Sequence, residues 1–150
     1  MSLSKDVEKA RTLVKRDGYD MSFGELLTIY DRNEFSIQPS YQRLFRWSSS
    51  QKSRFIESLL LGIPVPPLFV ATNADGHWEL VDGLQRVSTL LQFTGRLIKS
   101  GLSEEHSKAF VCEGTRLVPS LDGVVYDKKF GSSGNRVGDL GNFRALEACM

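Results

Sequence analysis

A proline-rich segment at positions 64–67, two residues after Gly62, most constrains how this chain can fold. Proline lacks a backbone N–H and clashes with the preceding helical turn, so no helix can continue through this segment. The residues before it have the spacing of an amphipathic helix, and Ser48 or Ser49 supplies its N-cap. The apolar face consists of Phe55, Ile56, Leu59 and Leu60. We therefore predict a helix that begins near Ser48 and ends at Gly62.

The segment after the prolines has the pattern of a β-hairpin. Residues 68–72 and 77–81 are the two predicted strands, and residues 73–76 supply the turn. Asp82 and Gly83 then break the chain, and residues 84–97 return to helical spacing. The centre of the chain is thus predicted to run helix, hairpin, Asp-Gly turn and helix, which indicates an α+β fold.

The N-terminal part is predicted to be mainly helical. Residues 5–16 have the pattern of a short charged helix. Ser22 and Glu25 then form a capping-box pattern that begins a second helix, which runs to about Asn33. In residues 35–39 apolar and polar residues alternate, and this segment is predicted to be extended.

The C-terminal part gives weaker signals. Short strands are possible at 110–112 and 116–118, and residues 128–141 have the composition of a loop. A helix is predicted to begin near Asn142 and to be cut off at Met150, as in a truncated chain. The predicted organisation is an N-terminal helical segment (1–34), a central domain (35–141) and the start of a truncated helix (142–150).

Composition excludes several classes of protein. An apolar fraction of 41% and a charged fraction of 25% are typical of a globular domain. No apolar run approaches the roughly 20 residues of a membrane helix, and the first residues have no signal-peptide pattern, so we expect a cytoplasmic protein without a membrane partner. Cys112 and Cys149 are predicted to be free, and no metal-ligand spacing is present. The net charge is only +1, but no acid lies between Glu34 and Glu57. That interval contains four basic residues, Arg43, Arg46, Lys52 and Arg54.

The Asp82–Arg86 segment is the strongest local candidate for a site. It lies where a strand gives way to a helix, and the first N–H groups of a helix bind anions. Gly83 would let a phosphate approach the backbone, Arg86 would contact phosphate oxygens, and Asp82 would hold a divalent cation or orient a water. In the alternative interpretation, Asp82 and Gly83 only form the turn, Asp82 caps the helix, and Gln85 and Arg86 face solvent.

A second candidate is the segment from Tyr41 to Trp47, where arginines alternate with aromatic residues. Arg43 and Arg46 suit a phosphate, and an aromatic ring suits a base. The alternative assigns Trp47 to hydrophobic packing just before the Ser48 cap, and we favour this for Trp47.

The order of these motifs resembles a known family. The motifs are Tyr41-Gln42-Arg43-x-Phe45-Arg46-Trp47, the helix that ends at Gly62, the proline segment, the hairpin and Asp82-Gly83-Leu84-Gln85-Arg86. Together they resemble the N-terminal domain of GmrSD-type modification-dependent restriction proteins and their relatives in anti-phage defence. The resemblance implies a ParB/sulfiredoxin-like α+β fold, a small mixed sheet with helices packed around it.

The resemblance also implies a function. The family's Asp-Gly-Gln-Gln-Arg motif is tied to NTP binding and hydrolysis, which regulates DNA cleavage by a separate HNH-type nuclease domain. By this resemblance Asp82, Gln85 and Arg86 would be catalytic, with Mg²⁺ accompanying the NTP. The phosphate-binding set would be Gln42, Arg43, Arg46, Gly83 and Arg86. Leu84 stands in place of the first glutamine, and no His-Asn-His pattern is present, so the chain itself should not cut DNA by that chemistry. The alternative function is a non-catalytic ParB-like module that binds DNA or senses its modification.

Overall fold

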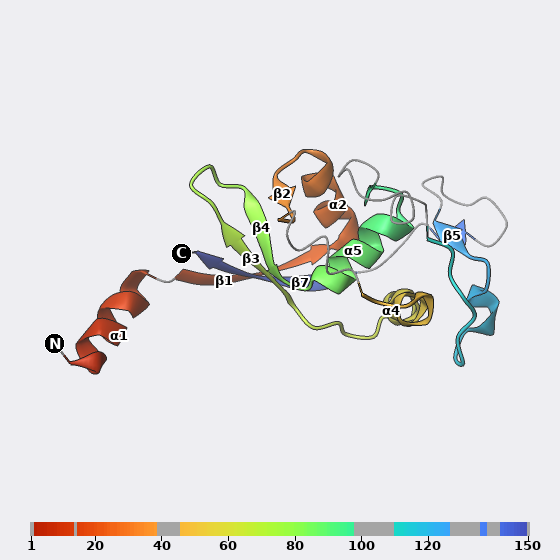
Figure 1. The fold of residues 1–150 in the computed structure, drawn as a ribbon, viewed down its shortest axis with the longest axis horizontal. Helices are drawn as coiled ribbons and strands as arrows, with labels where there is room; N and C mark the ends of the chain where they lie inside the picture. Colours follow the sequence, from red (N-terminus) through yellow and green to blue (C-terminus); the bar gives the residue numbers. More distant parts are fainter. Residues whose placement is uncertain are drawn as a thin grey trace.

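The fold was determined as a computed structural model, which describes residues 2–13, 15–38, 46–97, 110–126, 136–137 and 142–149. It is an α+β structure, as predicted, and its elements follow one another as Figure 1 shows. The helices are α1 (Leu3–Leu13), α2 (Phe23–Asp31), α4 (Ser49–Leu60), α5 (Leu84–Phe93) and the 3₁₀ helix η2 (Pro119–Leu121). The strands are β1 (Lys15–Ser22), β2 (Phe35–Ser36), β3 (Leu68–Thr72), β4 (Trp78–Asp82), β5 (Val125–Tyr126), β6 (Arg136–Val137) and β7 (Asn142–Cys149).

The main sheet is mixed and has five strands in the order β1-β7-β3-β4-β2. The hairpin β3–β4 is antiparallel, and β2 adds to its outer side in parallel with β4. On the other side β7 is parallel to β3 and antiparallel to β1. A small second sheet consists of β5 and β6, which are parallel.

The C-terminal prediction was wrong: Asn142–Cys149 is a strand, not the start of a truncated helix. It pairs with all of β1, from Lys15↔Cys149 to Ser22↔Asn142, and also with β3. The Ala, Leu and Glu residues of this segment favour a helix locally. Backbone pairing with two neighbouring strands outweighs that preference, because it satisfies the backbone groups on both sides of β7.

The N-terminal segment also differs from the prediction. The first helix ends at Leu13, and Lys15 and Arg16, assigned to it from the sequence, begin β1. Residues 1–34 therefore include a strand of the main sheet in addition to helices. Helix α1 has no buried residue and extends away from the sheet at one end of the molecule (Figure 1).

Serine capping boxes begin two helices as the sequence predicts. Ser22 accepts a hydrogen bond from the Glu25 N–H at the start of α2, and Glu25 accepts one from the Ser22 N–H. Ser48 and Gln51 make the same reciprocal pair at α4. Helix α4 ends before Gly62, whose φ of 68° is left-handed, and this confirms the predicted end of the helix.

One hydrophobic core joins α2, α4, α5 and the hairpin. Buried Leu68, Val70 and Leu80 alternate with exposed Phe69 and Val81, so one face of the hairpin packs against the helices. The predicted strands at 110–112 and 116–118 are absent from this described part of the chain. Helix α5 is shorter than predicted, because Thr94 and Gly95 end it.

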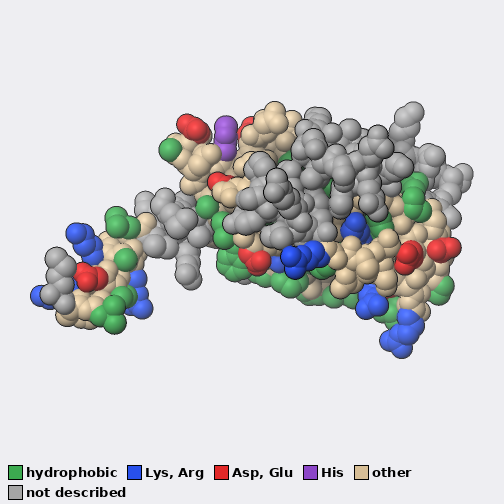
Figure 2. Space-filling model, viewed as in Figure 1, with side chains coloured by type: hydrophobic (Ala, Val, Ile, Leu, Met, Phe, Trp, Pro, Cys, Tyr) green, Lys and Arg blue, Asp and Glu red, His purple; other side chains and the backbone are tan. Residues whose placement is uncertain are grey.

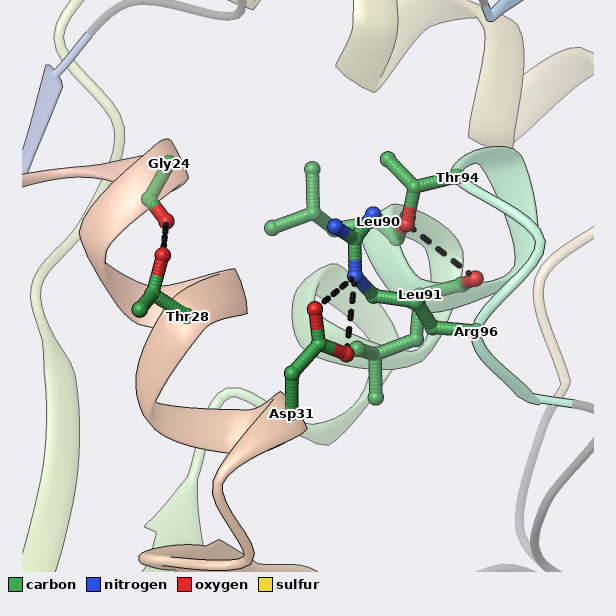
Figure 3. A network of polar contacts seen from close by, with 7 residues as sticks. All are labelled: Gly24, Thr28, Asp31, Leu90, Leu91, Thr94 and Arg96. Carbon is green, nitrogen blue, oxygen red and sulfur yellow. Dashed lines mark hydrogen bonds and ion pairs between the residues drawn. The ribbon is translucent and has the colours of Figure 1, made fainter. Parts of the chain in front are cut away.

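A polar link holds the end of α5 against α2. Arg96 donates from Nε to both carboxylate oxygens of Asp31, at 3.1 Å each, and Thr94 donates to the Leu90 carbonyl oxygen at 2.8 Å (Figure 3). The Leu90 carbonyl also accepts from the Thr94 N–H at 3.0 Å, so the hydroxyl adds a second hydrogen bond at the helix end. The Arg96–Asp31 contact joins this end of α5 to α2, and the candidate site lies at the opposite end of α5.

Candidate functional site

The candidate site lies where β4 ends and α5 begins. Asp82 is the last residue of β4, and Gly83 is the N-cap of α5, with φ 107° and ψ 20°. Gly83 has no side chain, so it makes no side-chain capping bond to the first N–H groups of the helix. The predicted strand-to-helix transition is therefore present, and Asp82 does not cap the helix.

Packing explains the glycine at position 83. A Cβ built there would lie 2.3 Å from Leu68 Cδ2 and 3.3 Å from Arg86 Nη2. The left-handed φ also disfavours every residue with a side chain. The space on the side where a Cβ would project is thus filled by Leu68 and Arg86, so a phosphate at this turn would have to approach the backbone N–H groups from another side.

Arg86 holds the proline segment against the start of α5. Its Nη1 group donates to the carbonyl oxygens of Pro66 and Pro67, the latter at 3.3 Å. Its Nη2 lies 3.9 Å from Asp82 Oδ2, and only 15% of its side chain is exposed. Burial lowers the pKa of the guanidinium, and the charge of Asp82 offsets part of this effect. The group remains a cation at neutral pH.

Gln85 connects the two motifs that the sequence singled out. Its Oε1 accepts hydrogen bonds from the backbone N–H groups of Arg46, at 3.0 Å, and Trp47, at 3.2 Å. The carbonyl end of this side chain therefore positions the segment that enters α4. This contact is structural, and it differs from the catalytic role assigned to Gln85 by the resemblance.

Of the other predicted site residues, two lie beside this junction and two are not among the described residues. The Arg46 side chain is exposed beside this junction, and Asp82 is exposed at its outer side. Gln42 and Arg43 lie outside the described residues. The structure thus brings Asp82, Gln85 and Arg86 close to the backbone of Arg46.

A groove of about 410 Å³ opens between α4, the proline segment and Arg86. Arg54 and Arg86 both line it, so the groove has two basic residues in its wall. Trp47 forms part of the wall and packs edge-on against Phe55, with ring centroids 5.7 Å apart, as expected for a packing role. Its other lining residues are Gln51, Phe55, Ser58, Pro64, Val65 and Pro66.

The walls of this groove were not predicted from the sequence. Arg54 was noted only as one of four basic residues, and the proline segment only as a helix stop. Both assignments lacked the same information, namely that Arg86 binds the proline carbonyls and holds that segment against the start of α5. Glu57, a buried acid on the adjacent face of α4, was also missed. The signal for it was a polar stripe of Ser50, Ser53 and Glu57 at helical spacing.

Charge is not concentrated on the face seen in Figure 2. Its described Lys and Arg side chains are separated by polar and acidic ones, without a continuous basic surface. Within the described ranges no group of three or more His, Cys, Asp or Glu residues is placed to hold a metal ion. The described helices are all too short or too polar to cross a membrane.

Comparison with known proteins identifies the family. The model of the GmrSD restriction endonuclease N-terminal domain matches residues 23–135, most of the chain. The chain belongs to the GmrSD N-terminal domain family. Neither the curated proteins nor the solved structures gave a match.

Membership in the GmrSD family makes the chain a component of a restriction or defence protein. The match begins at Phe23, the first residue of α2, and includes the Asp82–Arg86 turn and the whole groove. It confirms the family that the order of motifs indicated. The ParB/sulfiredoxin-like fold remains a prediction.

Proposed function

We propose that this GmrSD-type domain binds a nucleoside triphosphate in the groove between α4 and Arg86, and hydrolyses it. The observation that carries the proposal is that Arg54 and Arg86 line one groove. Guanidinium groups present a planar set of donors that matches phosphate oxygens. Binding and hydrolysis would regulate DNA cleavage by an HNH-type nuclease domain or subunit, as the family resemblance implies.

The residues around the groove would have distinct roles in this proposal. Arg54 is exposed, and its hydrogen bond to Ser50 Oγ is long, at 3.4 Å, so its guanidinium can turn towards a ligand. Arg86 would contribute its charge while it keeps its contacts with the proline carbonyls. The backbone of Arg46 is held beside Arg86 by the hydrogen bond to Gln85, so Arg46 would add a second exposed cation next to the groove.

Asp82 is the residue that would hold Mg²⁺. Its side chain is 70% exposed, next to the start of α5. Mg²⁺ is usually bound through one or two carboxylates together with the phosphates of the nucleotide. A single accessible carboxylate beside a phosphate groove fits that donor set. The ion would neutralise phosphate charge, and Asp82 would fix its position.

Calorimetric titration tests binding directly. The four NTPs and inorganic tripolyphosphate would be titrated into the wild-type chain, Arg54→Ala and Arg11→Ala. Arg11→Ala is a matched control, because Arg11 belongs to α1, which has no buried residue. We expect Arg54→Ala to weaken binding about tenfold or more, the effect of one charge-assisted hydrogen bond, and Arg11→Ala to leave it unchanged. Equal affinities for all three proteins would refute the groove as the site.

Phosphate release measured with and without Mg²⁺ tests hydrolysis separately. Release that requires Mg²⁺ and is lost in Asp82→Asn supports an NTPase. Binding without any release limits the domain to nucleotide sensing.

A second candidate function is DNA binding or recognition of modified DNA. The name of the family denotes a restriction endonuclease, an enzyme class that acts on DNA, and this favours the candidate. The near-neutral charge counts against it, because DNA affinity depends on several positioned cations. A binding constant that falls steeply with salt concentration would support DNA binding, and the absence of binding at low salt would exclude it.

A further inference from the structure

A second pocket, of about 490 Å³, lies on the adjacent face of α4. Its walls are α4 and the segment from Gly114 to Leu117. Ser53 fixes these walls together, because its Oγ donates to the Ser49 carbonyl oxygen at 2.8 Å and accepts from the Glu113 N–H at 2.8 Å. The pocket is therefore built by specific contacts between two segments distant in sequence.

Glu57 is the unusual residue of this pocket. Its side chain lines the pocket, the residue is only 8% exposed, and Oε2 has no hydrogen-bond partner in the described part of the chain. A buried polar atom without a partner destabilises the folded protein, because it has lost its hydrogen bonds to water. Such atoms are rare in folded proteins, and a missing ligand is one explanation for them.

Two cations complete the pocket. Arg54 and Arg116 also line it, and neither forms an ion pair with Glu57 among the described residues. The pocket thus presents an acceptor that lacks a donor, together with two exposed guanidinium groups. A ligand that pairs with the carboxylate and with both guanidinium groups must carry an N–H donor at one end and negative charge at the other.

Arg54 lines this pocket and also the groove proposed to bind phosphates. Gln51 and Ser58 face the groove, whereas Ser50 and Glu57 face the pocket. With about 3.6 residues per turn, these two faces lie about a quarter-turn apart around α4. One molecule can therefore contact both faces by passing over Arg54.

We infer that the Glu57 pocket takes the base of the nucleotide, and that it selects a base with an exocyclic amino group. This inference rests on the proposed nucleotide binding in the groove. The Glu57 carboxylate would accept a hydrogen bond from the amine, as acidic side chains do from the amino group of cytosine. Uracil presents a carbonyl oxygen at the same position, which would face the carboxylate oxygen without a proton between them.

The test compares CTP and UTP, whose bases differ only along this edge: cytosine has an amino group at C4 and an acceptor at N3, whereas uracil has a carbonyl oxygen at C4 and an N–H at N3. Calorimetry would be performed on the wild-type chain, Glu57→Gln and Glu113→Gln, with tripolyphosphate as a ligand without a base. Glu113→Gln makes the same chemical change at an exposed residue outside the pocket. We expect the wild-type chain and Glu113→Gln to bind CTP at least about tenfold more tightly than UTP.

Glu57→Gln should remove this preference or reverse it, because the amide can donate to the uracil carbonyl. Its affinity for tripolyphosphate should stay at the wild-type value, which also shows that the variant is folded. Equal affinities of the wild-type chain for CTP and UTP, with tripolyphosphate bound, would overturn the base pocket and leave the proposed function intact. No binding of any of these ligands would overturn both. The wild-type comparison requires no variant, so a Glu57→Gln protein that does not fold leaves this test in place.

Discussion

Arg86 is predicted to support both the fold and the phosphate site, and the two roles can be separated by measurement. Arg86→Ala removes the hydrogen bonds to the carbonyl oxygens of Pro66 and Pro67. It also removes the side-chain stem, and Arg86 lines a small apolar cavity together with Phe55 and Leu68. The perturbation therefore affects the proline segment and the groove at the same time.

The size of the stability effect follows from these contacts. A hydrogen bond from a charged donor contributes about 1.5–3 kcal/mol, and the exposure of the Pro66 contact places this one at the lower end. Together with the lost packing of the stem, we expect a loss of about 2 kcal/mol in the free energy of unfolding. For a chain of this length that lowers the melting temperature by about 4–8 °C.

Melting temperature and nucleotide affinity would be measured on the same samples, the latter well below the melting range. We expect Arg86→Ala to bind NTP about 10- to 100-fold more weakly, and Arg86→Lys to recover part of both losses because an ammonium cannot contact two carbonyl groups as a planar fork. Arg54→Ala is the matched comparison, because it should weaken binding without a change in melting temperature.

Two results would refute this reasoning. An Arg86→Ala protein that melts at the wild-type temperature would show that the carbonyl contacts do not stabilise the fold. A protein that melts early but binds NTP with wild-type affinity would make Arg86 a purely structural residue and remove it from the proposed site.

Three further outcomes are expected. In a urea titration, Gly83→Ala should lower the free energy of unfolding by at least about 2 kcal/mol, because it adds a contact of 2.3 Å with Leu68 to the strain of a positive φ. Gly76→Ala is the control, because no atom lies within 4 Å of a Cβ at that position, and it should show the strain alone, about 1–2 kcal/mol. Burial raises the pKa of the Cys112 thiol to about 12, so in a variant without the other cysteine this thiol should react with a disulfide reagent at pH 8 only as fast as the chain opens. The hydrogen bonds from Ser22 lower the pKa of Glu25 from its ordinary value of 4.5. The contribution of Glu25 to stability should therefore be complete above about pH 4.5 and be lost as the pH falls through the lower, folded-state pKa. Melting curves of Glu25→Gln should lack that part of the pH dependence.

The local signals in the sequence predicted the centre of the fold well. The capping box at Ser48, the hairpin turn before β4 and the break at Gly83 each depend on residues within a few positions of one another. Such signals act before any tertiary contact forms. They were therefore readable, and they placed the Asp82–Arg86 segment at the junction between β4 and α5.

The predictions failed where distant strands decide the structure. The sequence of β1, Lys15–Ser22, contains Asp and Gly and no apolar alternation, so nothing local marks it as a strand. β7 has the composition of a helix and is a strand because it lies between β1 and β3. Each of these segments gains its structure from the other, and a local pattern cannot contain that information.

The candidate site shows the same limit at the level of single side chains. Arg86 and Gln85 were selected as chemical groups, yet each uses part of its hydrogen-bonding capacity to hold a neighbouring segment: Arg86 the prolines, and Gln85 the entry to α4. These contacts position the walls of the groove that Arg54 lines, and among the described residues the Arg54 side chain makes one long, exposed hydrogen bond, to Ser50. The Asp82–Arg86 motif, which was selected from the sequence, thus positions the walls of the groove. The residue most available to a phosphate lies outside that motif, on the ridge of α4 between the two pockets, which is why Arg54→Ala is the variant that separates binding from folding.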